Sequence, residues 1–388
     1  MPTLGVGTLS RKTTAHRVIF VDLARALAVA LMVQGHTLEA LIDRSYQGRP
    51  LFNLWVFQRG LTSCLFLMLS GFAFSVATGR HWNNHTRLSR ASISRLRRFA
   101  FFVVLGYSLH LPASRFADFP LVTDDRWRAF IAVDVLQVIG VSLILLQLLV
   151  LVTRTPRALG AAAFVACALL AVATPRAWAI DWTPRLPLWL ASYISPAATG
   201  SSFPLIPWTA YVMLGAGLGQ IYSHWGAARL TSFANGFLLG AGAAMVVAAN
   251  VFGSLPVAPF GPSDFWSTSP NQFLLRAGLI LMVLGLLAHL SRRLNHLPHV
   301  FTAMAQESLL VYYVHLCIVY GSVWNRGLQS AFGPTLSVGR AFLLVAALVS
   351  AMAILASAWN WFKHAQQRAA RLLKTAILLG LTAVLLGL

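Results

Sequence analysis

The chain has 388 residues, of which 57% are hydrophobic and only 10% are charged, with a mean hydropathy of +0.70. A soluble domain carries about 25% charged residues, so this composition excludes an ordinary water-exposed surface. The formal net charge of +20 would suit a nucleic-acid-binding protein. Most of that excess, however, lies in short loops between apolar runs, as the positive-inside rule requires of membrane proteins. We therefore expect an all-α, polytopic transmembrane bundle in a lipid bilayer, with no nucleic-acid partner.

A helix that crosses a bilayer needs about 20 mainly apolar residues. Windows of that length predict ten spans, at 18–42, 52–78, 99–113, 129–153, 158–175, 203–223, 231–252, 272–290, 300–323 and 337–358. An eleventh run, 375–388, is short and either spans a thin region or lies at the interface. The first run is longer than the roughly 7–15 apolar residues of a signal peptide and contains charges, so it is a first transmembrane helix.

The basic residues predict the orientation. With the N-terminus in the cytoplasm, segments such as Arg95-Leu-Arg97-Arg98 fall inside, and acids such as Asp124 and Asp125 fall outside. We interpret 1–17 as a cytoplasmic tail, 18–358 as one transmembrane domain, and 359–388 as a basic segment with a short hydrophobic helix. The arginine-rich, lysine-poor composition is compatible with a multi-pass protein of a bacterial inner membrane.

A few ionisable residues remain inside the predicted spans. Such residues are costly in lipid, normally face the protein interior, and indicate a functional site. They are Asp22, Arg25 and His36 on the first span, Arg59 on the second, Asp134 on the fourth, Arg276 on the eighth, Glu307 and His315 on the ninth, and Arg340 near an end of the tenth.

The first span carries three of these residues on one face. Asp22 and Arg25 are three residues apart and are helical neighbours. Arg25 and His36 are eleven apart, which returns to within about 20° of the same face after a rise of about 16 Å. Taken alone, the Asp22–Arg25 pair fits an ion pair that only fixes helix packing, and His36 fits an interfacial histidine.

Several of the other ionisable residues are predicted to lie in the outer half of the membrane. Arg59 is predicted about 10 Å below the outer face, Asp134 and Arg276 lie within about two turns of it, and His315 shares a helical face with Tyr312. A shared polar cavity explains them together. Histidine is the usual general base near neutral pH, and arginine holds an oxyanion or a phosphate. Basic cytoplasmic loops would suit coenzyme A, although topology alone also explains them.

The first span resembles the opening helix of the transmembrane acyltransferase superfamily, which includes the acyltransferase-3 proteins and the heparan-α-glucosaminide N-acetyltransferases. The resemblance lies in Arg17, Asp22-Leu-Ala-Arg25 and Met32-Val-Gln-Gly-His36. Further similar pieces, in the family's order, are Phe57-Gln-Arg59, Leu65-Phe66 through Ser70-Gly71, Arg95-Leu-Arg97-Arg98, Asp134-Val-Leu-Gln137, Pro204-Leu-Ile-Pro207-Trp208 and Glu307-Ser308 through Tyr312 and His315. Together they cover about residues 17 to 320.

The resemblance implies a membrane acyltransferase that moves an acyl group, most simply acetyl, from cytoplasmic acetyl-CoA or another acyl-CoA to an outward-facing sugar or glycolipid. His36 would be the catalytic histidine, as general base or acyl carrier, with Asp22 and Arg25 beside the donor path. The cavity-lining residues would be Arg59, Asp134, Gln137, Arg276, Glu307, Tyr312 and His315. No metal is implied, and the oligomeric state, including a homodimer, stays open. The sequence departs from the family in Ala26, where a glycine is usual. We expect no soluble C-terminal domain, so acceptor capture would use the outer loops. The outer tryptophans Trp182, Trp189, Trp208 and Trp266 fit either stacking on a sugar ring or an aromatic belt at the membrane interface, and the belt is the commoner explanation.

Two other interpretations stay open. A proton-coupled secondary transporter would use the outer polar cluster as its substrate site, with Glu307 or Asp134 as a proton relay. A membrane scaffold without a site leaves the buried charges unexplained.

The pairs Gly215 and Gly219, and Gly236 and Gly240, have small-xxx-small spacing and predict close helix packing.

Overall fold

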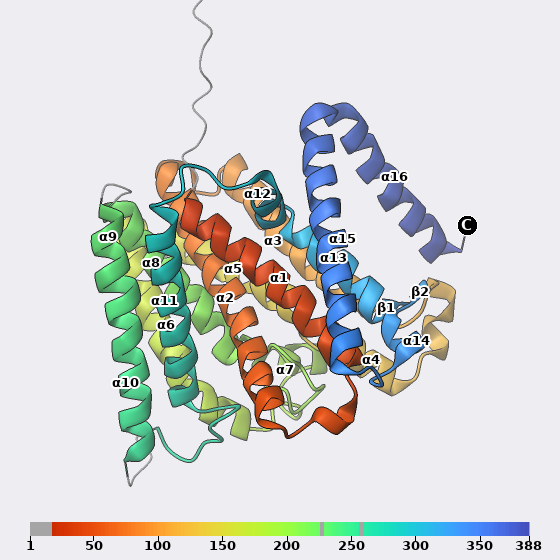
Figure 1. Ribbon diagram of the computed structural model, residues 1–388, viewed down its shortest axis with the longest axis horizontal. Helices are drawn as coiled ribbons and strands as arrows, with labels where there is room; N and C mark the ends of the chain where they lie inside the picture. The colour runs from red at the N-terminus through yellow and green to blue at the C-terminus, as the bar shows by residue number, and fades with distance from the viewer. Residues whose placement is uncertain (1–17, 226–228, 256–259, 388) are drawn as a thin grey trace, which may run out of the picture.

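The computed structural model describes residues 18–225, 229–255 and 260–387. The described chain is almost entirely helical (Figure 1). Its α-helices are α1 Ile19–Leu41, α2 Pro50–Arg80, α3 Arg90–Leu109, α4 Asp124–Ile131, α5 Val135–Thr153, α6 Pro156–Ala179, α7 Leu188–Ile194, α8 Leu205–Trp225, α9 Leu230–Phe233, α10 Ala241–Ser254, α11 Pro270–Ser291, α12 His299–Gln306, α13 Ser308–Val319, α14 Leu328–Phe332, α15 Val338–Ala365 and α16 Gln367–Leu386.

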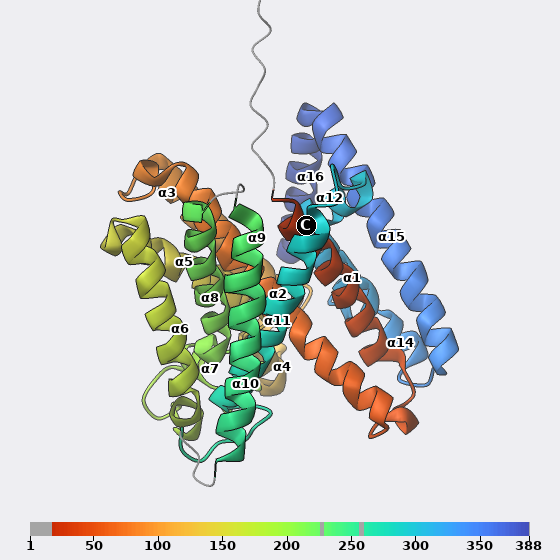
Figure 2. The same cartoon turned by 60° about the vertical axis from the view of Figure 1, so that its left-hand side comes forward.

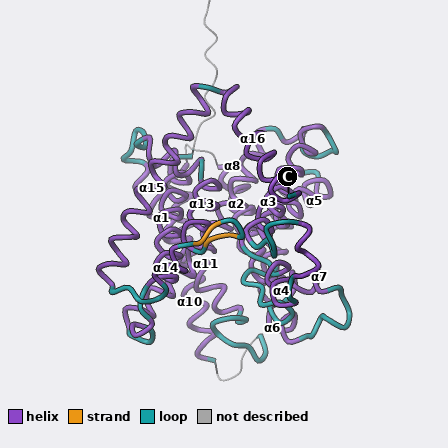
Figure 3. The backbone as a smooth tube through the Cα atoms, turned by 90° about the vertical axis from the view of Figure 1, so that its right-hand side faces the viewer, coloured by secondary structure: helices purple, strands orange, loops and turns teal. Residues whose placement is uncertain are grey.

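Shorter elements join these helices. They are the 3₁₀ turns η1 Arg44–Tyr46, η2 Trp82–Asn84 and η3 Phe116–Leu121, the π-helical segment η5 Ala234–Gly240 between α9 and α10, and the antiparallel strands β1 Gly321–Ser322 and β2 Asn325–Arg326. The two strands form a small hairpin beyond the end of α13, drawn in orange in Figure 3.

The prediction of an all-α polytopic bundle is confirmed. Within the described ranges, eight helical segments are long and apolar enough to span a membrane, and the bent pair α12–α13 makes a ninth. The expected spans 99–113 and 203–223 correspond to α3 and α8, which do not meet the same apolar criterion, although each is about 30 Å long. The short run expected at 375–388 is part of α16, which extends over 20 residues.

Two expected spans are interrupted. The span expected at 129–153 begins only at Val135, because α4 ends at Ile131 and Asp134 starts a new helix by accepting a hydrogen bond from the Val135 N–H at 2.7 Å. Short polar side chains stabilise helix N-termini in this way. The span expected at 300–323 is two helices, α12 and α13, bent by 78° at Glu307. Both interruptions therefore occur at an acidic residue that the sequence pattern assigned to a continuous helix.

Helix α1 lies at the centre and joins two groups of helices (Figure 2). One hydrophobic core combines α1 with α2, α5, α6, α8 and α11. A second core combines the opposite side of α1 with α12, α13 and α15. Because α1 belongs to both, the charged face predicted on this helix lies between the two groups rather than against lipid.

Helices α2 and α8 approach so closely that their backbones touch at glycine. A Cβ added to Gly71 would lie 1.9 Å from the Val212 carbonyl oxygen, and one added to Gly215 would lie 1.9 Å from that of Met68. Gly219 packs against α2 in the same way, as expected. The expectation for Gly236 and Gly240 is wrong, because neither faces another helix closely. The close contact of α10 with α11 uses Gly242 and Gly278 instead.

The terminal helix α16 stands apart from the bundle in Figure 1, and only Ala370 of it is buried. It turns back from the end of α15 at Gln366 and reaches η3 at its far end. The described residues therefore leave its surface exposed over most of its length.

Candidate active site

A large cavity of about 1150 Å³ runs between the two groups of helices. At the end of the bundle where α1 begins, its walls include Arg25, Arg95 and Arg98. At the opposite end they include Trp266 and Tyr320. The cavity therefore extends along the length of the bundle, and residues from both membrane faces line it.

His36 lies on this cavity and is held by a chain of polar contacts. Its Nδ1 is 3.1 Å from the Tyr320 hydroxyl oxygen, and that hydroxyl donates to the Glu39 carboxylate at 3.0 Å. The second carboxylate oxygen of Glu39 forms an ion pair with Arg59. The Arg59 guanidinium in turn lies over the Trp55 ring, with its Cζ 5.5 Å from the ring centroid. Four side chains from α1, α2 and the end of α13 thus fix the imidazole.

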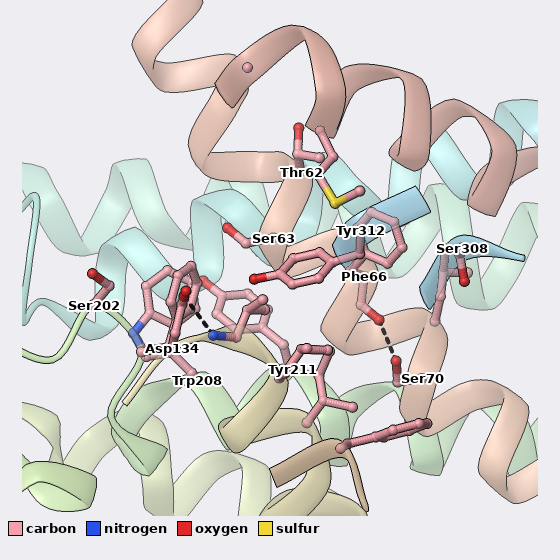
Figure 4. Close-up of a pocket in the computed structure, with 18 of the residues that line it drawn as sticks. Thr62, Ser63, Phe66, Ser70, Asp134, Ser202, Trp208, Tyr211, Ser308 and Tyr312 are labelled. Atoms are coloured by element: carbon pink, nitrogen blue, oxygen red, sulfur yellow. Dashed lines mark hydrogen bonds between the residues drawn. The ribbon is translucent and has the colours of Figure 1, made fainter. Parts of the chain in front are cut away.

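A second layer of polar groups stands beside His36. The ring of His315 lies 5.4 Å from that of His36, and Tyr312 packs edge-on against His315. The His315 Nδ1 is 2.7 Å from the Val311 carbonyl oxygen, to which it donates, so its Nε2 carries the lone pair. Figure 4 shows Tyr312, Asp134, Trp208 and Tyr211 around the same hollow, from three different segments of the chain, because Trp208 and Tyr211 both belong to α8.

Arg276 on α11 contributes a further cation to the cavity wall. Its guanidinium lies against the backbone of α2, where a Cβ on Gly60 would come within 3.0 Å of it. No carboxylate of the described residues lies within ion-pair distance of Arg276, and its Nε has no hydrogen-bond partner among them. A glycine at position 60 therefore makes room for a guanidinium that has no ion-pair partner among the described residues.

The other end of the cavity is arginine-rich. Arg95 donates to the Thr78 hydroxyl at 2.8 Å and to the Gln147 side-chain oxygen at 3.4 Å, and its Cζ is 4.9 Å from the Phe74 ring centroid. Arg25 lines both this cavity and a small adjoining pocket, which also contains Asp22. Arg95 is therefore oriented by its neighbours rather than extended freely into water.

The structure separates four of the expected residues from the cavity wall, of which Asp22 lines only the adjoining pocket. Gln137 is fully buried and packs against Gly106 of α3, because its position faces the α3–α5 contact. His315 is fully buried behind His36 and Tyr312. Glu307 is buried at the bend between α12 and α13, where Lys363 and Asn360 bind its carboxylate. By contrast, Arg25, His36, Arg59, Asp134, Arg276 and Tyr312 all line the cavity.

Several residues that the structure brings to the site were not among those predicted from the sequence. Glu39 lies three residues after His36, so helical spacing would have found it. Arg95 belongs to a basic loop whose charges topology alone explains. Tyr320 lies 284 residues from His36 in the chain, and only the fold brings the two together.

The arrangement can carry out acid–base chemistry at the midpoint of a long path. The oriented imidazole of His36 lines the cavity, the Arg276 guanidinium has no ion-pair partner among the described residues, and three arginines line one end. Arginines at one end of such a path are suited to an anionic group, and the imidazole is suited to a proton transfer.

A family model described as "Heparan-alpha-glucosaminide N-acetyltransferase, catalytic" matches residues 17–247 of the chain. The match includes the helices that carry His36, Arg59, Arg95 and Asp134. It ends before α11 and α13, which carry Arg276 and Tyr312. No curated protein matches the chain.

Proposed function

The chain belongs to the heparan-α-glucosaminide N-acetyltransferase catalytic family, and is in broad terms a membrane acetyltransferase, so we propose that it transfers acetyl from cytoplasmic acetyl-CoA to a sugar hydroxyl or amine on the opposite side. The observation that carries this proposal is the cavity itself. It extends from Arg95 at one end of the bundle to Trp266 at the other, with His36 on its wall between them. A donor and an acceptor that approach from opposite faces would meet at that imidazole.

The donor is assigned to the arginine-rich end. Coenzyme A carries a 3′-phosphate and a diphosphate, and arginine binds such groups through paired N–H donors. Arg95 is supported for this role because Thr78 and Gln147 already orient its guanidinium. Arg25 and Arg98 line the same end. The wall between this end and His36 is largely apolar, with Phe66, Phe99 and Phe102, and suits the pantetheine arm.

The acceptor is assigned to the opposite end. Trp178, Trp208 and Trp266 line the cavity there, whereas Trp182 and Trp189, which the sequence also suggested, do not. Aromatic faces bind the apolar faces of sugar rings. Ser202, Ser267 and Gln272 on the same walls offer hydrogen bonds to hydroxyl groups.

The proposed reaction needs two proton transfers, one from the acceptor to His36 and one from His36 to the coenzyme A thiolate. The His36 Nε2 removes the proton of the acceptor hydroxyl or amine while the acceptor oxygen or nitrogen forms its bond to the thioester carbonyl carbon. Arg276 offsets the negative charge that develops on the carbonyl oxygen. The carbon–sulfur bond then breaks, the thiolate takes the proton from His36, and free coenzyme A leaves with acetylated acceptor as the other product.

The test is release of free thiol from acetyl-CoA by the purified protein in detergent, with glucosamine as the probe acceptor and N- or O-acetylglucosamine measured by mass spectrometry. We expect His36→Ala to remove turnover, by about 100-fold or more, while the melting temperature and acetyl-CoA binding are retained. A fully active His36→Ala protein would refute the role of His36. If a stable protein neither binds nor consumes acetyl-CoA, and instead accumulates a solute in vesicles under a pH gradient, the transporter interpretation replaces this one.

A further inference from the structure

The contacts of His36 fix where its hydrogen lies. Glu39 accepts two contacts, from the Arg59 guanidinium and from the Tyr320 hydroxyl. A carboxylate paired with arginine is ionised and can only accept hydrogen bonds. The Tyr320 hydroxyl hydrogen is therefore directed at Glu39, and the tyrosine oxygen is left as an acceptor.

The Tyr320 oxygen in turn determines which ring nitrogen of His36 carries the hydrogen. Its Nδ1 lies 3.1 Å from the Tyr320 oxygen, which has no second hydrogen to donate. For this contact to be a hydrogen bond, the hydrogen must be on Nδ1 of His36. In a neutral imidazole the other nitrogen, Nε2, then holds the lone pair.

The surroundings leave Nε2 for the cavity. No hydrogen bond joins His36 Nε2 to any other described residue, although His36 lines the cavity. No hydrogen bond joins His36 to His315 in the described part of the chain: the His315 Nδ1 donates to Val311, and the two rings are tilted by 45° with centroids 5.4 Å apart. The Tyr320 ring meets His36 edge-on, with centroids 5.6 Å apart, and restrains its rotation.

We propose that Glu39 and Tyr320 are positioning residues that hold His36 in the Nδ1–H tautomer, so that Nε2 is the basic atom presented to the cavity. Arg59 contacts Glu39, Glu39 contacts Tyr320, and Tyr320 contacts His36. Bases in other active sites are oriented by a further polar group in a similar way. The catalytic meaning of Nε2 rests on the proposed function, whereas the tautomer itself does not. Tyr320 and Glu39 act through His36 and need not touch the substrate.

The first test is independent of activity. Nitrogen-15 NMR of the histidine-labelled protein in detergent distinguishes a protonated ring nitrogen from an unprotonated one, and His36→Gln identifies the His36 signals by difference. We expect a neutral Nδ1–H ring in the wild type at pH 8 and loss of that preference in Tyr320→Phe. The matched control is Tyr313→Phe, because the Tyr313 hydroxyl bonds Ser108 and lies outside the cavity lining. An Nε2–H ring in the wild type, or an unchanged ring in Tyr320→Phe, would overturn the proposal.

The second test asks whether the two residues act through His36. Tyr320→Phe and Glu39→Gln should each lower kcat for acetyl transfer to glucosamine by about tenfold or more, with little change in the KM for acetyl-CoA. In the His36→Ala background, neither substitution should lower residual turnover further, since the group they position is absent. Equal losses in both backgrounds would contradict the proposal. If the wild type has the expected tautomer but no acetyl transfer, the proposed function fails and the tautomer assignment stands.

Glu39→Gln also removes the partner of Arg59 and can disturb folding. Tyr320→Phe removes a single oxygen and leaves that ion pair intact, so it decides the outcome if Glu39→Gln is unstable. Glu39→Asp is the third variant, and its partial recovery of kcat relative to Glu39→Gln is expected if the charge is what matters.

Discussion

The Lys363 Nζ lies 2.5 Å from the Glu307 carboxylate, at the point where α12 and α13 bend by 78°. Asn360, one helical turn before Lys363 on α15, donates to the same carboxylate oxygen at 2.9 Å. Glu307 is 5% exposed, so its charge has almost no access to water. The bend that brings Ser308 and Tyr312 to the cavity is therefore secured by α15, not by the bent segment alone.

Replacing one partner of this pair should destabilise the fold. Lys363→Met leaves a buried carboxylate without its cation, and such losses cost about 3–5 kcal/mol. The double variant Lys363→Met with Glu307→Gln should recover much of that loss, because no unpaired charge remains. Thermal melting in detergent checks both, with Arg368→Met at an exposed position of α16 as control. Equal melting temperatures for the single and double variants would show that the pair is not coupled.

The bend also shows what the sequence could and could not predict. Hydrophobic runs and basic loops were enough for the helical architecture, and the eleven-residue spacing was enough to put Arg25 and His36 on one wall. They could not predict the break at Glu307, because a single acidic residue in an apolar run fits a continuous helix equally well. Nor could they predict the Tyr320–His36 contact, since it depends on the tertiary position of α13 against α1. Gln137 was misplaced for a related reason, because helical periodicity gives a face without saying which neighbour covers it.

The oriented arginine at the donor end predicts a selective effect on acetyl-CoA. Arg95→Gln should raise the KM for acetyl-CoA by about tenfold or more, as the loss of a charge-assisted hydrogen bond of about 1.5–3 kcal/mol implies. Arg97→Gln is the matched control, because Arg97 belongs to the same turn but does not line the cavity. Steady-state kinetics at saturating glucosamine measure both. A similar KM for the two variants would remove Arg95 from the donor site.

The contact between α2 and α8 should tolerate no added methyl group. Gly71→Ala would put a Cβ against the Val212 carbonyl, and such overpacking costs about 1–3 kcal/mol or more. The melting temperature should fall clearly for Gly71→Ala and little for Gly79→Ala, whose Cβ would meet only the Ser223 side chain, no nearer than 3.6 Å. A stable Gly71→Ala protein would mean that the two helices can separate at little cost.

Low pH should decrease the free energy of unfolding through His85, which lies in the loop next to the donor end. Burial, and then the charges of Arg95 and His81, lower the pKa of His85 below its ordinary value of 6.5. The unfolded chain therefore binds more protons than the folded one as the pH falls through 6.5, and the free energy of unfolding decreases. His85→Gln cannot take up that proton, so its melting temperature should fall less between pH 7.5 and 5.5 than that of the wild type. His364→Gln, at an exposed position, should follow the wild type; a parallel decline in all three proteins would exclude His85 as the source.

The acceptor end offers a matched pair of tryptophans. Trp266 and Trp189 are 62% and 55% exposed, but only Trp266 lines the cavity. Loss of one aromatic face against a sugar ring costs about 1 kcal/mol, which corresponds to roughly a fivefold change in binding. Trp266→Ala should therefore raise the KM for glucosamine by about that factor and leave the KM for acetyl-CoA unchanged, while Trp189→Ala should change neither. If Trp266→Ala instead raised the KM for acetyl-CoA, the two substrates would enter from the opposite ends to those proposed, and the arginine-rich mouth would have to be reassigned to an anionic acceptor.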